Sequence, residues 1–152
     1  AEGLSNLGNI LFSQIGGSMG PIYGTIFMDS ADEGMDLEEI TVKDLANMLA
    51  TGLAGLQEIV EAQVGDKTLV DTLSPAVDSL KESAEAGTDF PEALEKMKAA
   101  AKKGMESTKD MVAKFGRSSR LGERSRGVLD AGSVSCCIIL TAMADGIAEN
   151  LD

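Results

Sequence analysis

Hydrophobic residues recur at the spacing of an α-helix along most of the chain. The clearest stripe covers residues 42–60, where an apolar residue returns every three or four positions and Thr41 stands in the N-cap position. Similar stripes predict further helices over residues 4–15, 22–34, 69–87, 90–115 and 133–147. The pattern therefore predicts six helices, and no segment alternates as a strand would.

Glycine, proline and capping residues mark where these helices are predicted to begin and end. Gly34, Gly87 and Gly116 each follow a periodic stretch, and Asp89 has the form of a cap before the fifth helix. Pro75 falls inside the fourth stripe, where it predicts a kink or a first-turn position rather than a helix end. After Gly116 the period is lost up to residue 132, which predicts a long ordered loop of the kind that carries function.

Length and composition agree with one helical domain. At 152 residues, a compact chain hides roughly 70% of the surface that it would expose when unfolded, so a real core is expected. Leu, Ile, Met and Ala supply the apolar fraction, and no self-similar period marks a solenoid. We therefore expect a single all-α domain over residues 1–152, built as an antiparallel up-and-down helical bundle or barrel.

The excess of acidic residues limits the kinds of molecule that the protein is expected to bind. The 25 acidic residues against 13 basic ones give a net charge of -12, which disfavours attraction to nucleic acid or to an anionic membrane surface. No apolar run approaches the roughly 18 residues needed to span a bilayer, and the N-terminal residues lack the form of a secretory signal. We therefore expect a cytoplasmic protein that binds neither nucleic acid nor membrane.

The chain contains no histidine, which removes several kinds of chemistry. Ser-His-Asp and Cys-His nucleophiles, imidazole acid–base catalysis and the commonest zinc sites all need that side chain. Cys136 and Cys137 are adjacent in an apolar run with no further cysteine to pair with, so we expect them to be reduced and buried. Any chemistry must then rest on carboxylates, hydroxyls, lysine, arginine, backbone amides or a bound ion.

Three glycine-bearing breaks, at residues 16–21, 64–68 and 116–132, are each followed by a predicted helix. A helix N-terminus behind glycines offers N–H groups without helical partners and the positive end of the helix dipole, which suit a phosphate group. Any one break could equally be an ordinary turn between helices. The three together favour a shared anion site, because helices that begin at the same end of a bundle bring their loops together.

All four arginines of the chain lie inside the third break, in one stretch of ten residues, and are Arg117, Arg120, Arg124 and Arg126. They predict a cationic site for phosphate oxygens, which a guanidinium binds in bidentate geometry, and a solvated loop is the alternative. We expect Glu123 and Asp130 to hold some of the arginines in place, with Arg124 as the ion-pair partner of Glu123.

The three breaks together resemble the nucleotide-binding L subunit family of dihydroxyacetone kinase. The matching motifs are Gly-Gly-Ser-Met-Gly-Pro-Ile-Tyr-Gly-Thr at 16–25, Val-Gly-Asp-Lys-Thr-Leu-Val-Asp at 64–71, Gly-Arg-Ser-Ser-Arg-Leu-Gly-Glu-Arg-Ser at 116–125 and Asp-Ala-Gly at 130–132. The resemblance implies an eight-helix up-and-down barrel that holds ADP or ATP at one end, and phosphoryl transfer to dihydroxyacetone held by a separate K subunit. The third motif is most similar to the branch that depends on the phosphotransferase system, in which a phosphocarrier M subunit rephosphorylates the bound ADP.

The resemblance also implies which residues contact the nucleotide. They belong to the three motifs, and are Gly16, Gly17, Ser18, Met19, Thr68, Leu69, Arg117, Asp130 and Gly132. Arg120 and Arg126 replace uncharged residues of the family, so we expect them to face solvent or a partner.

The chain departs from the family's pattern at the metal site. The family binds Mg²⁺ through aspartates of a Gly-Asp-x-Asp-His-Gly motif between its first two helices, and the sequence contains neither that motif nor a histidine. The six predicted helices would then correspond to the third to eighth helices of the barrel, without the N-terminal metal-binding segment. Because the metal neutralises charge during phosphoryl transfer, the alternative is a non-catalytic module that binds a nucleotide or a partner protein.

Overall fold

The computed structural model describes residues 1–151, and over that range it contains six α-helices, two 3₁₀ helices and no strand. The predicted all-α class and the predicted number of helices are therefore confirmed. The chain forms two compact units, residues 1–61 and residues 62 onward, which are described separately below. A single domain over residues 1–152 stays a prediction.

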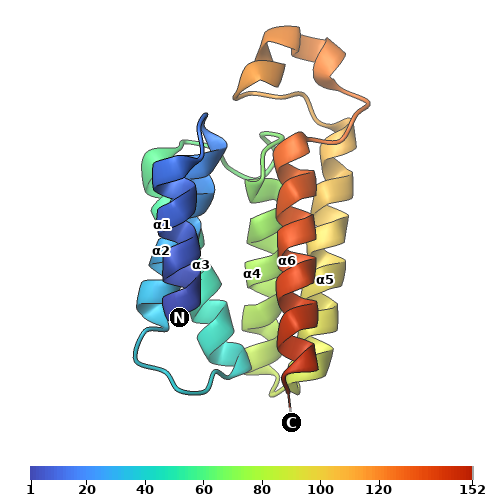
Figure 1. Cartoon of the computed structure of the whole chain (residues 1–152). Helices are drawn as coiled ribbons and strands as arrows, with labels where there is room; N and C mark the ends of the chain where they lie inside the picture. Colours follow the sequence, from blue (N-terminus) through green and yellow to red (C-terminus); the bar gives the residue numbers. More distant parts are fainter. Residues whose placement is uncertain (152) are drawn as a thin grey trace. The chain divides into compact units, whose positions relative to one another are not determined.

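The first unit consists of three consecutive helices, α1 (Glu2–Gln14), α2 (Met19–Glu33) and α3 (Val42–Ile59), as Figure 1 shows. α2 packs against both α1 and α3, and α2 and α3 supply nearly all the buried residues of this unit. On α2, the rings of Tyr23 and Phe27 stack with their centroids 6.0 Å apart. The predicted end of the second helix is confirmed, since α2 is followed by Gly34.

Two local signals in the sequence explain the geometry of the first unit. Thr41 and Asp44 form a reciprocal capping box at the start of α3, in which each side chain accepts a hydrogen bond from the other residue's backbone N–H. At the α1–α2 contact, a Cβ atom on Gly24 would lie 2.9 Å from the carbonyl oxygen of Gly8 and 2.8 Å from the Cβ of Phe12. The two helices approach this closely only because glycine has no side chain there.

The second unit is a bundle of α4 (Val70–Glu85), α5 (Phe90–Ser107) and α6 (Ala131–Glu149), with the 3₁₀ helices η1 (Thr108–Asp110) and η2 (Arg117–Ser125) between α5 and α6. α5 packs against α4 and α6, which also contact each other. Their fully buried side chains include Leu73, Leu80, Leu94 and Met97. Because α4 and α5 are joined by a short turn and pack together, they run antiparallel, and α4 and α6 begin at the end of the bundle where α5 ends (Figure 1).

The end of the fifth helix differs from the prediction. The fifth helix was expected to reach residue 115, but α5 ends at Ser107 and the chain continues through η1 into an extended stretch. The hydroxyl groups of Ser107 and Thr108 donate to carbonyl oxygens three residues earlier, which favours a tightened last turn over a longer helix. Pro75 lies inside α4, so the expectation that it does not end the helix is confirmed.

α6 is more apolar than the sequence analysis allowed for. Among residues 1–151 it is the one helix whose length and composition would let it cross a membrane, with a mean hydropathy of 1.6. The expectation that no run approaches this size is therefore wrong for α6. Core helices of soluble proteins meet the same criterion and α6 packs on α4 and α5, but only 28% of the stretch is buried and Ile138 is 63% exposed.

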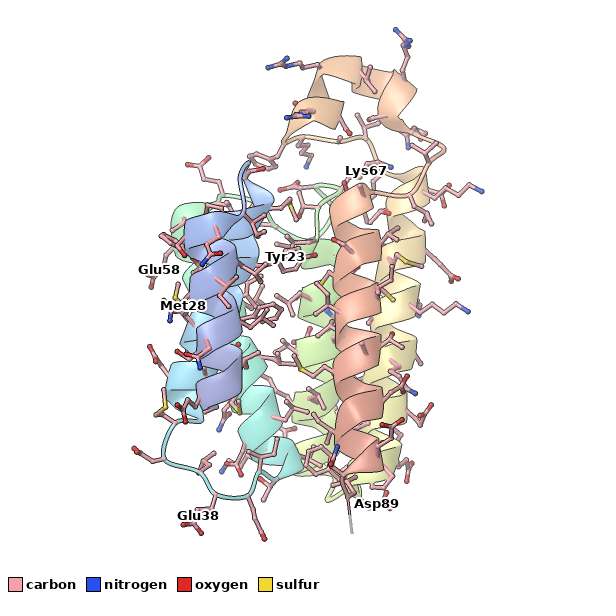
Figure 2. All side chains as sticks on the ribbon, viewed as in Figure 1. Tyr23, Met28, Glu38, Glu58, Lys67 and Asp89 are labelled. Carbon is pink, nitrogen blue, oxygen red and sulfur yellow. The ribbon has the colours of Figure 1, made fainter. Side chains whose placement is uncertain are left out.

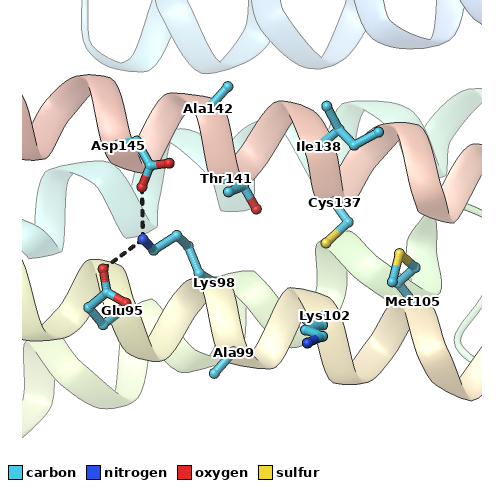
Figure 3. A pocket seen from close by; sticks show the side chains of 10 residues that line it. All are labelled: Glu95, Lys98, Ala99, Lys102, Met105, Cys137, Ile138, Thr141, Ala142 and Asp145. Atoms are coloured by element: carbon cyan, nitrogen blue, oxygen red, sulfur yellow. Dashed lines mark hydrogen bonds and ion pairs between the residues drawn. The ribbon is translucent and has the colours of Figure 1, made fainter.

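The two cysteines and a shallow groove lie on α6. Both cysteines are unpaired thiols and buried, as predicted, and burial raises the pKa of the Cys136 thiol to about 12, with a smaller contribution from Cys137. Between α5 and α6, a groove of about 670 Å³ is lined mostly by apolar atoms (Figure 3). Lys98 bridges the two helices beside it, with its Nζ 2.6 Å from Glu95 and 2.7 Å from Asp145.

Candidate functional site

The N-termini of α4 and α6 are joined by hydrogen bonds. The hydroxyl of Ser133 donates to the carbonyl oxygen of Thr68 at 2.5 Å, and the hydroxyl of Thr72 donates to the carbonyl oxygen of Ser133 at 3.1 Å. Ser133 and Thr72 are both fully buried, so these bonds are protected from water. Two parallel helix N-termini side by side direct backbone N–H groups and positive dipole ends toward the same region, which favours an anion.

Asp71 shapes the turn before α4. Its carboxylate is buried and accepts hydrogen bonds from the backbone N–H of Gly65 at 2.6 Å and of Thr68 at 2.8 Å. Asp71 therefore folds residues 64–68 back over the start of α4, in the way that a capping residue satisfies N–H groups with no helical partner. The turn holds Thr68 and Leu69 at the N-terminus of α4.

Asp130 caps α6 and connects it to the end of α5. Its carboxylate accepts a hydrogen bond from the backbone N–H of Ser133 at 2.8 Å, and its own N–H donates to the hydroxyl of Thr108 at 3.0 Å. Gly132 faces Leu69 across the two N-termini. Four of the predicted contact residues, Thr68, Leu69, Asp130 and Gly132, thus lie together at one end of the second unit.

The arginine-rich segment stands beyond the ends of α5 and α6 (Figure 1). It is η2, a 3₁₀ helix interrupted at Gly122, whose φ of 54° and ψ of -131° break the helix into two parts. The buried hydroxyl of Ser125 accepts from the N–H of Ala113 at 2.9 Å and donates to the carbonyl oxygen of Gly122 at 2.6 Å. The predicted loop is therefore ordered, and it contains helical turns that the sequence analysis did not predict.

Three of the four arginines have exposed side chains without an ion pair in the part of the chain that the structure describes, namely Arg117, Arg120 and Arg124. The predicted pair of Arg124 with Glu123 is wrong, because Glu123 pairs with Arg126, whose Nε lies 3.0 Å from its carboxylate. A 3₁₀ helix has three residues per turn, so side chains at i and i+3 share a side and adjacent ones diverge. Arg126 also donates to the carbonyl oxygen of Asp110, so its exposed side chain is held in place on the protein surface. Within residues 1–151, Asp130 caps α6 and pairs with no arginine.

Lys67 is a buried residue of this site that the sequence analysis did not single out. It is 2% exposed and has a left-handed backbone with φ of 62°. Its ammonium donates to the carbonyl oxygens of Thr108 and Val128, and Figure 2 shows it at the end of the second unit where α6 begins. The sequence indicates only that Lys67 belongs to the Gly-Asp-Lys-Thr turn. This position does not reveal which atoms the lysine side chain contacts.

The turn at residues 16–19 belongs to the first unit. Gly16, Gly17, Ser18 and Met19 are all exposed, and Ser18 precedes α2 without a side-chain capping bond. The turn thus presents backbone N–H groups and a hydroxyl at the start of a helix. Its participation in a common site with the second unit stays a prediction.

Within residues 1–151 there is no group of three or more His, Cys, Asp or Glu side chains that could hold a metal ion. The carboxylates of this site have other partners. Asp71 and Asp130 accept hydrogen bonds from backbone N–H groups, and Asp66 forms an ion pair with Lys114. The described residues therefore do not fit a Mg²⁺ ion by themselves.

Asp66 gives the turn before α4 a dependence on pH. A hydrogen bond from Lys114, whose Nζ lies 2.7 Å away, and one from the N–H of Gln63 hold the pKa of this largely buried carboxyl below its ordinary value. A lowered pKa contributes stability above the unfolded pKa, about 4, and the contribution is lost as the pH falls through the folded pKa. We expect Asp66→Asn to reduce the free energy of unfolding at pH 7 and to matter progressively less below pH 4.

Urea unfolding of the parent and of Asp66→Asn at pH 7 and pH 3 measures this effect. In a Lys114→Met background the difference between the two pH values should shrink, because Lys114 is the main cause of the lowered pKa. An effect of Asp66→Asn that is the same at both pH values would contradict the assignment.

Comparison with known proteins places the chain in a family. Residues 1–145 match the DAK2 domain. The chain is 37% identical over 141 residues to the ADP-binding subunit DhaL of the PEP-dependent dihydroxyacetone kinase of Escherichia coli, covering 93% of this chain and 67% of that protein. It is 33% identical over 146 residues to the corresponding subunit of kinase 2 of Listeria innocua, covering 96% of this chain and 67% of that protein. The chain thus spans about two thirds of the length of these relatives.

A solved structure has the same fold. The native dihydroxyacetone kinase of C. freundii superposes with a TM-score of 0.67 at 24% identity, over 94% of this chain and 23% of that chain. The same kinase in complex with AMP-PNP and Mg²⁺ superposes with a TM-score of 0.63. The predicted resemblance is confirmed by these relatives, and the chain belongs to the DAK2 domain family.

Proposed function

We propose that the chain is the ADP- or ATP-binding component of a dihydroxyacetone kinase. The observation that carries this proposal is the pairing of the α4 and α6 N-termini through Ser133 and Thr68, beside a segment with three exposed arginines that have no ion pair among the described residues. Relatives named as ADP-binding subunits support the same reading over that of a non-catalytic module.

In this proposal the nucleotide phosphates lie against the N-termini of α4 and α6. The N–H of Leu69 and the hydroxyl of Thr68 face the phosphate oxygens at the start of α4, the turn after Asp130 faces them at the start of α6, and Arg117 adds a bidentate guanidinium. The family resemblance assigns the exposed turn of Gly16, Gly17, Ser18 and Met19 to the nucleotide as well. Together these residues bind and orient the anion, and the buried carboxylate of Asp71 keeps the turn before α4 in shape.

The finer features of the reaction follow from the family. We propose that a K subunit holds dihydroxyacetone, and that a phosphocarrier M subunit of the phosphotransferase system rephosphorylates the bound ADP in the cytoplasm. Mg²⁺, when bound, would neutralise phosphate charge during transfer, and residues 1–151 contain no group of three or more carboxylates that could hold it. The role proposed for the described residues is the binding of the nucleotide.

Reconstitution tests this function. The protein is mixed with a K subunit, dihydroxyacetone, Mg²⁺ and either ATP or the phosphorylated M subunit with ADP, and dihydroxyacetone phosphate is measured. Formation of product that depends on this chain supports the kinase. ADP binding without product under both conditions would favour the non-catalytic module, and no binding of ADP would contradict the proposal.

A further inference from the structure

The ammonium of Lys67 closes the base of the arginine-rich segment. Thr108 begins η1, which precedes this segment in the chain, and Val128 follows the segment, and Lys67 donates to the carbonyl oxygens of both. The backbone adds a second closure, since the N–H of Gly127 donates to the carbonyl oxygen of Lys109 at 2.7 Å. One side chain from the turn before α4 therefore fixes both ends of the excursion that carries Arg117.

The position of Lys67 excludes a direct contact with a phosphate group. Lysines in glycine-containing turns at helix N-termini often reach toward phosphate, but the Lys67 side chain is buried and its ammonium donates to main-chain oxygens. The carbonyl of Thr108 also lies near the C-terminal end of α5, where the helix dipole favours a cation. The ammonium of Lys67 thus binds carbonyl oxygens inside the protein and is not available to a ligand.

The backbone of the turn is held in an uncommon conformation at this residue. A left-handed φ of 62° is rare outside glycine and is maintained only where neighbouring contacts fix it. Here Asp71 accepts from the N–H groups of Gly65 and Thr68 on either side, and the carbonyl of Asp66 accepts from the N–H of Lys114 at 3.2 Å. These contacts direct the Lys67 side chain inward, toward α5 and Val128.

We propose that Lys67 is a positioning residue, which sets the place of Arg117 relative to the Thr68–Leu69 turn and thereby the affinity for a nucleoside diphosphate. The proposal rests on the proposed function, because it assumes that ADP binds at this end of the second unit. Lys67 acts through the arginine-rich segment and does not touch the ligand.

A double-mutant cycle on ADP affinity tests this role. We expect Lys67→Met to weaken ADP binding about tenfold. Arg117→Ala should lower the ADP affinity of the parent more than that of Lys67→Met, because in Lys67→Met the arginine is already displaced from the phosphate. Lys102→Met, an exposed lysine of α5, is the matched control and should leave both the affinity and the effect of Arg117→Ala unchanged. Lys67→Arg, which keeps the positive charge, should bind ADP more tightly than Lys67→Met. If Lys67 only filled space, restoring the charge would not restore affinity.

Chemical acetylation of the parent protein tests the same role without a variant, in case Lys67→Met does not fold. Lys67 should react at least tenfold more slowly than the exposed Lys109, and ADP should slow it further, because the ammonium becomes accessible only when the segment opens. Additive effects in the cycle, or acetylation of Lys67 that bound ADP does not change, would overturn the inference while leaving the proposed function intact. A parent that binds no ADP would overturn both.

Discussion

Arg117→Ala is expected to weaken ADP binding by ten- to a hundredfold while leaving the thermal stability of the ligand-free protein unchanged. The exposed side chain of Arg117 has no ion pair among residues 1–151, so its removal costs the ligand-free protein little. Its loss removes a charge-assisted contact to phosphate, worth about 1.5 to 3 kcal/mol. Calorimetric titration with ADP and a thermal melt measure the two quantities.

Arg120→Ala is the matched control for this prediction. Arg120 is also exposed in η2 and also lacks an ion pair within the described residues, but the family resemblance does not place it against the nucleotide. We expect Arg120→Ala to change the affinity much less. If Arg117→Ala binds ADP as the parent does and Arg120→Ala does not, the assignment of the phosphate ligand within this segment is wrong.

Asp71→Ala is expected to destabilise the second unit more than any exposed substitution on α4. It removes the acceptor of two hydrogen bonds, from Gly65 and Thr68, and leaves their N–H groups without that acceptor in a partly buried turn. Bonds to a charged group contribute about 1.5 to 3 kcal/mol each, and rehydration of the turn offsets part of this, so we expect a loss of about 3 kcal/mol. ADP affinity should fall as well, because the Thr68–Leu69 turn loses its shape.

Urea unfolding and ADP titration of three variants separate these effects. Asp71→Asn keeps one acceptor and should lose less stability than Asp71→Ala, whereas Asp78→Ala, at an exposed position of the same helix, should stay within about 0.5 kcal/mol of the parent. If Asp71→Ala is as stable as Asp78→Ala, the turn before α4 does not depend on the Asp71 carboxylate.

Local patterns in the sequence were sufficient to predict the helices. The stripe and cap at Thr41 predicted α3, because the capping box with Asp44 involves residues only three apart. The end of α5 was missed, because apolar residues at 111–115 continue a helical period although the chain leaves the helix after Ser107. That departure depends on contacts distant in sequence, including the bond between Lys67 and the carbonyl of Thr108.

The candidate site was predicted in its residue types but not in its contacts. The glycine-bearing turns and the arginine cluster indicated an anion site, and the structure brings Thr68, Leu69, Asp130 and Gly132 together. The pairing of Arg126 with Glu123 could not be predicted, because it depends on a 3₁₀ period that the sequence does not reveal. Which of the arginines meets the phosphate stays a prediction.

Amide hydrogen exchange of the protein with and without ADP tests the central claim most directly. If the nucleotide phosphates lie at the paired N-termini of α4 and α6, ADP should slow exchange over residues 64–70, 116–118 and 130–133, and at the turn of residues 16–19. The groove between α5 and α6 provides an internal reference, and its residues around Lys98 and Thr141 should exchange equally in both states. ADP binding that protects this groove, or that leaves residues 64–70 and 130–133 unchanged, would contradict the proposed site.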